Sequence, residues 1–310
     1  MQPRRTLIGA CLIAVLLTPA PGNTETQATL SYSQIVGFGD SLSDPGNRFF
    51  VTGEQSLPPF EAIPGPPYAI GGHHYSNGST WLEQLALLIN DPMSGNPGYK
   101  LNRRFSNYAF GGARARDTES QADLMEQVLF YLGENGGNAD PNALYVIWVG
   151  ANDAFDALRA YPGGADILPS AVGAVIESIL TLHAAGAEHF LIPNLPNLAI
   201  TPAAQGNAAL LAYLLSGGFN TALDDTLSSI EPFYDFTIHR LDIWSLLNSV
   251  HAAPAAFGLE NVLAPCLAFG VTESVVCATP ETYLFWDAIH PTTVTHGILA
   301  DFAYGLLTSP

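Results

Sequence analysis

The sequence predicts an α/β protein in which helices cover both faces of a parallel sheet. Short apolar runs alternate along the chain with longer stretches that carry apolar residues at helical spacing. Strands that alternate with helices form βαβ units, and the strands of such units are parallel. Roughly 280 residues follow a predicted N-terminal leader, a length that suits one large α/β domain better than two.

Four segments are expected to be strands. The run 144–150 is almost continuous in apolar residues, which is typical of a strand that is covered on both faces. The shorter run 35–38 ends at a Gly-Asp pair, as a buried strand does when it enters a tight turn. The segments 189–193 and 237–241 are the other two expected strands.

Three helices are predicted from apolar residues that recur on one face. The three stripes are Leu168, Val172, Val175, Ile176 and Ile179; Phe219, Leu223, Leu227 and Ile230; and Val294, Ile298, Phe302 and Leu306. Asp166 is the expected cap of the first helix, and Pro169 is tolerated in its first turn. Pro291 is expected to open the last helix. We interpret all three stripes as core packing.

Residues 1–22 are interpreted as a secretory signal peptide, because Arg4 and Arg5 precede an uncharged stretch that ends in small residues and prolines. A retained N-terminal anchor is the alternative, but the apolar stretch is short for a membrane span. Cleavage after Gly22 fits the preference for small residues, and Ala28 is another candidate site. The protein is therefore expected to be secreted, either to a periplasm or beyond the cell.

Charge and cysteine content narrow the possible partners. The net charge is −18, and Lys100 is the only lysine. This argues against nucleic acid, which is bound by clusters of Lys and Arg, and against docking to anionic membranes, but not against apolar contact with lipid. Without Cys11 of the leader, Cys266 and Cys277 remain, and export favours a disulfide between them over two free thiols. A zinc site would need more ligands.

The segment 52–75 is rich in Pro and Gly and is expected to form a long surface loop. It either lines the functional site or simply connects two elements, and both interpretations stay open. His73 and His74 in this loop are expected to be exposed polar surface.

Ser41 directly follows the first expected strand, at the end of the sheet where ligands of open α/β proteins collect. A serine nucleophile needs a base, and the base needs a group that orients it. Asp287 and His290, three residues apart, are suited to these two roles, although a capped surface turn is the alternative for that pair alone. Gly112 and Asn152 lie in turns that could offer N–H donors to an oxyanion.

The blocks 39–47, 107–113, 150–153 and 287–290, taken in this order, resemble the GDSL esterase/lipase family, also called SGNH hydrolases. The resemblance includes 75–78 and 283–287 and covers nearly the whole chain after the leader. It points to the secreted bacterial and plant-like branch that contains lipases, phospholipases and haemolysins. Pro45 stands where Thr is common in the family, but no catalytic position is missing.

The resemblance implies a three-layer α/β/α sandwich with a central five-stranded parallel sheet, flavodoxin-like, as a single domain over 23–310. It implies that Ser41 is the nucleophile and donates its own N–H to the oxyanion, together with the N–H of Gly112 and the side chain of Asn152. His290 is then the general base and acid, and Asp287 orients it. Neither a metal, nor an organic cofactor, nor a protein partner is implied.

The predicted function is hydrolysis of small-molecule or lipid carboxylic esters through an acyl-enzyme intermediate. Lipid acyltransferases and polysaccharide deacetylases share this machinery, but the apolar composition favours lipid-like or generic acyl esters over acetylated sugars. The alternative from another class is a secreted module that binds lipid or glycan without catalysis. The complete set of five catalytic positions argues against it.

Among the remaining polar residues, Asp40 and Asp44 are expected to hold the turn around Ser41 through backbone hydrogen bonds. His296 would compete with His290 as a base only if Asp287 were absent.

Overall fold

The computed structural model describes residues 32–53, 72–120, 122–269 and 274–309. The predicted signal peptide and most of the Pro-rich loop expected at 52–75 lie outside the described residues. Their interpretation therefore stays a prediction.

A four-stranded parallel sheet forms the centre of the molecule, in the order β1-β2-β3-β4. The strands are β1 (Ile35–Gly39), β2 (Leu144–Trp148), β3 (His189–Pro193) and β4 (Thr237–Leu241). Every residue of β1 and β2 is buried, which explains why these strands are continuous apolar runs in the sequence. All four predicted strands are confirmed, and their carboxyl ends lie at the same edge of the sheet.

The expected fifth strand corresponds to a less regular segment, 106–110, beside β1. Gly37 and Asn107 form an isolated parallel bridge. The N–H of Gly37 donates to the carbonyl of Ser106, and the N–H of Tyr108 and Phe110 donate to the carbonyls of Gly37 and Gly39. The segment therefore extends the sheet, but it is too irregular to count as a strand, so the described sheet has four strands.

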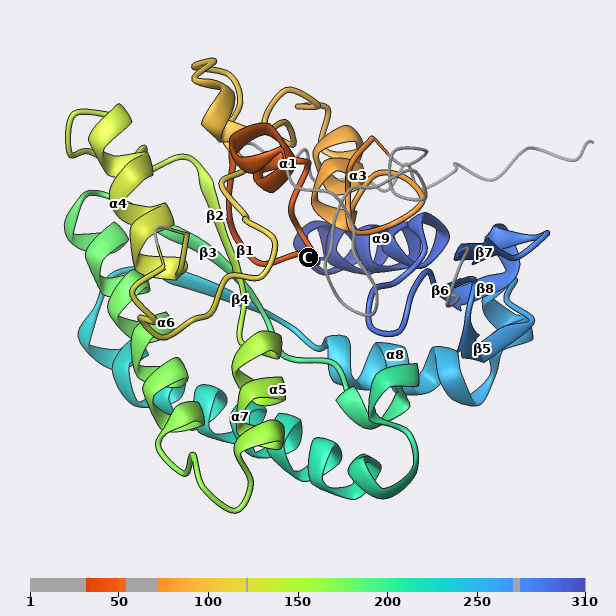
Figure 1. The fold of residues 1–310 in the computed structure, drawn as a ribbon. Coiled ribbons are helices and arrows are strands. Elements are labelled where there is room, and N and C mark those ends of the chain that lie inside the picture. The colour runs from red at the N-terminus through yellow and green to blue at the C-terminus, as the bar shows by residue number, and fades with distance from the viewer. Residues whose placement is uncertain (1–31, 54–71, 121, 270–273, 310) are drawn as a thin grey trace, which may run out of the picture.

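Helices cover both faces of this sheet (Figure 1). One face packs against α4 (Leu124–Glu134), α5 (Ala151–Ala160), α6 (Ile167–Ala184) and α7 (Ala209–Ile230). The other face packs against α3 (Trp81–Leu88), α8 (Ile243–Ala252) and α9 (Thr293–Thr308). Alternate residues of one strand supply the two cores: Val36 and Phe38 face the first set of helices, and Ile35 faces the second. The predicted α/β class with a layer of helices on each face is confirmed.

The apolar stripes predicted for α6 and α7 form their buried faces, apart from Leu168 and Ile230, which are partly buried. Asp166 lies at the N-cap of α6, although its side chain makes no capping hydrogen bond. By length and composition α6 could cross a membrane. Its apolar side chains instead pack in the core, as those of a core helix do.

The stripe predicted for α9 is wrong by about one residue. The buried face consists of Thr295, His296, Leu299, Ala300, Ala303 and Leu307, whereas Phe302 is 38% exposed. Two polar and two small residues occupy this face, so apolar periodicity does not mark it. Pro291 does not open α9 either, because the helix begins at Thr293 and the Thr292 side chain caps it.

Smaller elements complete the described chain. The parallel pair β5 (Asn261–Pro265) and β8 (Tyr283–Phe285) and the antiparallel pair β6 (Leu267–Phe269) and β7 (Ser274–Val276) lie beside α9 (Figure 1). The sulfur atoms of Cys266 and Cys277 are 2.05 Å apart, at the length of a disulfide. A short helix, α1 (Asn47–Thr52), follows the turn after β1. The single-turn helices are η1 (Gly98–Lys100), η2 (Leu198–Ile200), η3 (Pro202–Ala204), η4 (Gly206–Ala208), η5 (Glu231–Phe233), η6 (Pro254–Phe257) and η7 (Pro280–Thr282).

Candidate active site

Ser41 lies in a tight turn at the carboxyl end of β1. The Oδ1 atom of Asp40 accepts the N–H of Leu42 at 3.0 Å, and the Asp40 carbonyl accepts the N–H of Ser43 at 3.1 Å. Asp44 accepts the N–H groups of Gly46 and Asn47 at 2.8 and 2.6 Å. Both acids therefore hold the turn as predicted. Ser41 itself is 8% exposed, so its hydroxyl lies at the surface of a pocket rather than in open solvent.

The Ser41 hydroxyl, the His290 imidazole and the Asp287 carboxylate form one hydrogen-bonded chain. The distance from Ser41 Oγ to His290 Nε2 is 2.8 Å, and that from His290 Nδ1 to Asp287 Oδ2 is 2.7 Å. A carboxylate only accepts hydrogen bonds, so Nδ1 carries the proton and Nε2 of the neutral ring accepts the Ser41 O–H. In this arrangement the imidazole can take the serine proton.

The short loop after β8 fixes this histidine. Asp287 Oδ1 accepts the N–H groups of Ile289 and His290 at 2.9 and 2.7 Å, and the N–H of Trp286 donates to the His290 carbonyl at 2.7 Å. The carboxylate therefore shapes the loop with one oxygen and orients the ring with the other. The spacing of three residues between Asp287 and His290 is what allows one side chain to do both.

The two other oxyanion candidates lie on neighbouring segments. Gly150, at φ +119°, turns the chain from β2 into α5, so that Asn152 lies in the first turn of this helix at the rim. The Asn152 amide donates to the Ala113 carbonyl at 2.9 Å, which joins α5 to the Gly111-Gly112 turn. No hydrogen bond within the described residues takes up the backbone N–H of Ser41 or of Gly112. These N–H groups therefore stay available to a ligand.

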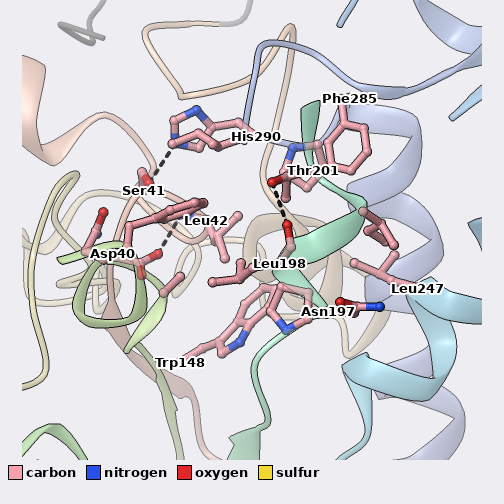
Figure 2. A pocket seen from close by; sticks show the side chains of 17 residues that line it. Asp40, Ser41, Leu42, Trp148, Asn197, Leu198, Thr201, Leu247, Phe285 and His290 are labelled. Atoms are coloured by element: carbon pink, nitrogen blue, oxygen red, sulfur yellow. Dashed lines mark hydrogen bonds between the residues drawn. The ribbon is translucent and has the colours of Figure 1, made fainter. Parts of the chain in front are cut away.

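A narrow pocket begins at Ser41: about 40 Å³ of it is open to the centre of a water-sized molecule, and all empty space out to the open mouth amounts to about 560 Å³. Figure 2 shows Ser41 and His290 on one side of it and Leu247 and Phe285 on the opposite side. Asn152 also lines it, whereas Gly112 does not. The other walls are mainly apolar side chains from separate elements: Leu42, Trp148, Phe155, Leu198, Ile200 and Ile289. Such a lining favours an apolar group beside the serine.

Burial raises the pKa values of the two acids in the turn around Ser41. Burial raises the pKa of Asp40 to about 7, while the N–H of Leu42 and the positive charge of His290 act in the opposite direction. Burial also raises the pKa of Asp44 to about 6, against the effect of four backbone N–H donors.

Sequence reasoning missed several contacts of the site. The Tyr75 ring lies 5.0 Å from the His290 ring, measured between centroids. Ser76 Oγ donates to the Pro291 carbonyl at 2.9 Å, and Asn77 Oδ1 accepts the N–H of Thr293 at 2.8 Å. The block 75–78, noted only for its resemblance to the family, therefore supports the loop that carries His290. No sequence pattern identified the pocket wall at 196–201.

The expectation that His74 is exposed is wrong. His74 is 8% exposed, and its Nε2 atom lies 2.9 Å from the Glu83 carboxylate on α3. This contact joins residues nine positions apart, and the loop-like sequence around His74 does not indicate it.

His296 is fully buried beneath the site on α9, and its Nδ1 atom has no hydrogen-bond partner within the described part of the chain. Burial, followed by the nearby His290 and His74 when these are charged, lowers the pKa of His296 to about 3. The ring that is hydrogen-bonded to Ser41 Oγ is that of His290, so we assign the role of base to His290 and not to the buried His296.

This burial predicts a pH effect on stability. In the unfolded chain His296 titrates near pH 6.5, so the unfolded state binds more protons than the folded state as pH falls from 6.5 toward 3. The histidine therefore lowers the free energy of unfolding in that window. Relative to wild type, a His296→Leu variant should gain about 2 kcal/mol of stability between pH 7.5 and pH 5. Urea denaturation of both proteins at pH 7.5 and pH 5 measures their stabilities. If the stability of His296→Leu relative to wild type is the same at both pH values, the lowered pKa of His296 is contradicted.

Within the four described ranges, no group of three or more His, Cys, Asp or Glu side chains is arranged to hold a metal ion.

Comparison with known proteins shows which family the chain belongs to. The sequence profile described as GDSL-like lipase/acylhydrolase matches residues 35–303. Esterase EstA of Pseudomonas aeruginosa is 31% identical in an alignment that covers 99% of this chain and 51% of EstA. The thermolabile hemolysin of Vibrio parahaemolyticus is 27% identical, over 87% of this chain and 62% of the hemolysin. The phosphatidylcholine-sterol acyltransferase of Aeromonas hydrophila is 25% identical, over 90% of this chain and 91% of that protein. The chain thus spans about half the length of EstA.

Proposed function

Because the chain belongs to the GDSL-like lipase/acylhydrolase family, we propose that it hydrolyses carboxylic esters through an acyl-enzyme intermediate on Ser41. The observation that carries this proposal is the continuous chain of hydrogen bonds from Ser41 Oγ through His290 to Asp287, at 2.8 and 2.7 Å. A serine hydroxyl is a weak nucleophile until such a base removes its proton.

In the first half of the proposed reaction, Ser41 Oγ attacks the ester carbonyl carbon while its proton passes to His290 Nε2. The Asp287 carboxylate stabilises the imidazolium that forms. The negative charge on the former carbonyl oxygen is met by the N–H groups of Ser41 and Gly112 and by the Asn152 amide. When the carbon–oxygen bond of the ester breaks, His290 returns the proton to the departing alkoxide, which leaves as an alcohol.

In the second half, water takes the place of the alcohol. His290 accepts a proton from the attacking water, and the tetrahedral intermediate forms again on the same three donors. Its collapse releases the carboxylic acid and returns the proton to Ser41 Oγ. The enzyme is regenerated, and the net reaction converts one ester and one water into one acid and one alcohol. An alcohol that attacks in place of water would make the product a new ester, which is how an acyltransferase activity would arise on the same residues.

The substrate that we propose is an ester with an apolar acyl group, supported by the apolar walls of the pocket beside Ser41. We also propose that the protein acts after export, supported by the basic and apolar pattern of residues 1–22 and by the disulfide between Cys266 and Cys277.

The test has two parts. A serine-directed fluorophosphonate probe should label Ser41 in the folded protein, and mass spectrometry of the labelled peptide identifies the residue. A series of nitrophenyl esters from acetyl to palmitoyl, with a phospholipid and an acetylated xylan beside it, then measures acyl preference. Lack of labelling at Ser41, or binding of these esters without turnover of any, would overturn the proposal in favour of a binding module.

Loss of one oxyanion donor is expected to slow the reaction without weakening binding. An Asn152→Ala variant should lower kcat by about 10²–10³-fold and leave KM nearly unchanged, because the amide meets charge that exists only in the transition state. Steady-state kinetics on a nitrophenyl ester checks this. The exposed Asn138 provides the control, and Asn138→Ala should keep wild-type kcat. A kcat for Asn152→Ala within threefold of wild type would exclude this role.

A further inference from the structure

One peptide group of the Gly111-Gly112 turn is held at its carbonyl end by an arginine. The Gly111 carbonyl and the Gly112 N–H belong to the same planar trans peptide, so they point in opposite directions. Arg48 Nη1 donates to the Gly111 carbonyl oxygen at 2.8 Å. The direction of the Gly112 N–H is therefore tied to the position of the Arg48 guanidinium.

The segment 44–48, which contains Arg48, also binds the N–H of Gly111. Its N–H donates to Asp44 Oδ2 at 2.8 Å, and this oxygen also accepts the Arg48 N–H at 3.2 Å. Asp44 is completely buried. The turn that follows Ser41 and the helix α1 thus clamp Gly111 at both its N–H and its carbonyl, and they connect the serine turn to the Gly-Gly turn directly.

The packing around the two glycines leaves no room for side chains. A Cβ atom at Gly112, whose φ is +84°, would lie 2.6 Å from Arg48 Nη1. A Cβ atom at Gly111 would lie 2.1 Å from the Tyr75 hydroxyl oxygen. Arg48 therefore lies directly against the backbone of the turn, and rotation of the 111–112 peptide would break its hydrogen bond to the carbonyl.

A second arginine on this turn acts on a different peptide. Arg114 Nη1 donates to the Gly112 carbonyl at 2.6 Å, and the same guanidinium pairs with Asp156 at 3.0 Å. The N–H of that next peptide belongs to Ala113, and it donates to the Phe110 carbonyl at 3.1 Å. Of these two peptides in the described structure, the one held by Arg48 has its N–H available to a ligand, whereas the N–H of the next one is taken up.

We propose that Arg48 is a positioning residue of the oxyanion site, whose guanidinium holds the 111–112 peptide so that the Gly112 N–H faces the developing oxyanion. This inference rests on the proposed ester hydrolysis. A hydrogen bond from a charged donor also polarises the amide, which makes its N–H a stronger donor. Both effects act on the transition state more than on the bound ester, so they change kcat more than KM.

The experiment compares Arg48→Met, which keeps the length of the side chain without a donor, with Arg48→Lys, which keeps a cation and a donor. Arg48→Met should lower kcat about 10- to 100-fold with KM changed less than threefold, and Arg48→Lys should recover at least part of the loss. The affinity for a trifluoromethyl ketone, whose adduct with serine carries an oxyanion, should fall in parallel with kcat/KM. The exposed Arg103 is the control, and Arg103→Met should retain wild-type kinetics.

Each outcome decides the inference. Wild-type kcat in Arg48→Met, or equal losses in kcat and in the affinity for the product acid, would overturn it. Circular dichroism and the thermal midpoint establish that each variant is folded, and if Arg48→Met does not fold, Arg48→Lys and Arg48→Gln carry the comparison. In that case, if both Arg48→Lys and Arg48→Gln have the same kcat as wild type, Arg48 is not a positioning residue. If wild type is not labelled at Ser41 and turns over no ester, the proposed function itself fails, and this inference fails with it.

Discussion

Replacing Ser41 by alanine is expected to lower ester turnover by about 10⁶-fold, to a residual rate that depends only on binding and the oxyanion donors. The fold should persist, because the hydrogen bond lost is a single one, to His290 Nε2 at 2.8 Å. The measurement is kcat/KM on a short-chain nitrophenyl ester, with circular dichroism and a thermal midpoint on the same samples.

A second buried serine provides the matched control for this variant. Ser178 lies inside α6 and is fully buried, and its hydroxyl has no hydrogen-bond partner among the described residues. Ser178→Ala should keep wild-type turnover, so that the loss in Ser41→Ala reports chemistry rather than the removal of a buried hydroxyl. Retention of turnover within 100-fold in Ser41→Ala would mean that another group attacks the ester.

An Asp287→Asn substitution should lower ester turnover by about 10⁴-fold. This is the size of the effect in serine hydrolases when the carboxylate that orients the catalytic histidine is replaced by an amide. Asparagine can still accept the two loop N–H groups with its carbonyl oxygen, so the loop after β8 should keep its shape. Its NH₂ group would face His290 Nδ1, and this favours the tautomer with the proton on Nε2. That tautomer cannot accept the Ser41 proton.

The variant is checked by kcat/KM together with the rate at which a fluorophosphonate labels Ser41, since both require the base. Asp166→Asn is the control, because Asp166 is exposed at the start of α6 and makes no capping hydrogen bond. A loss below tenfold in Asp287→Asn would show that orientation of His290 does not depend on the carboxylate.

The four strands of the central sheet and the helices α6 and α7 could be predicted because burial leaves a direct trace in residue order. Strands covered on both faces become continuous apolar runs, as β2 is, and helices with one buried face become periodic, as α6 and α7 are. The same reasoning failed for α9, where Thr295 and His296 lie on the buried face although neither side chain is apolar. The apolar runs indicated four strands, which is the number in the sheet, whereas the fifth strand implied by the family resemblance corresponds to 106–110, which pairs with β1 only in part.

The local chemistry of the site follows from residues that are close together along the chain: a serine in a turn held by Asp40 and Asp44, and a carboxylate three residues before a histidine. Interactions over a few residues depend on spacing, and spacing is visible in the chain. How these parts meet depends on the packing of the whole fold. Ser41 and His290 are separated by 249 positions and are joined because their loops lie at the same edge of the fold. The apolar pocket and the contact of Arg48 with the Gly111 carbonyl likewise arise from packing between distant segments, where distance in space has no counterpart in distance along the sequence.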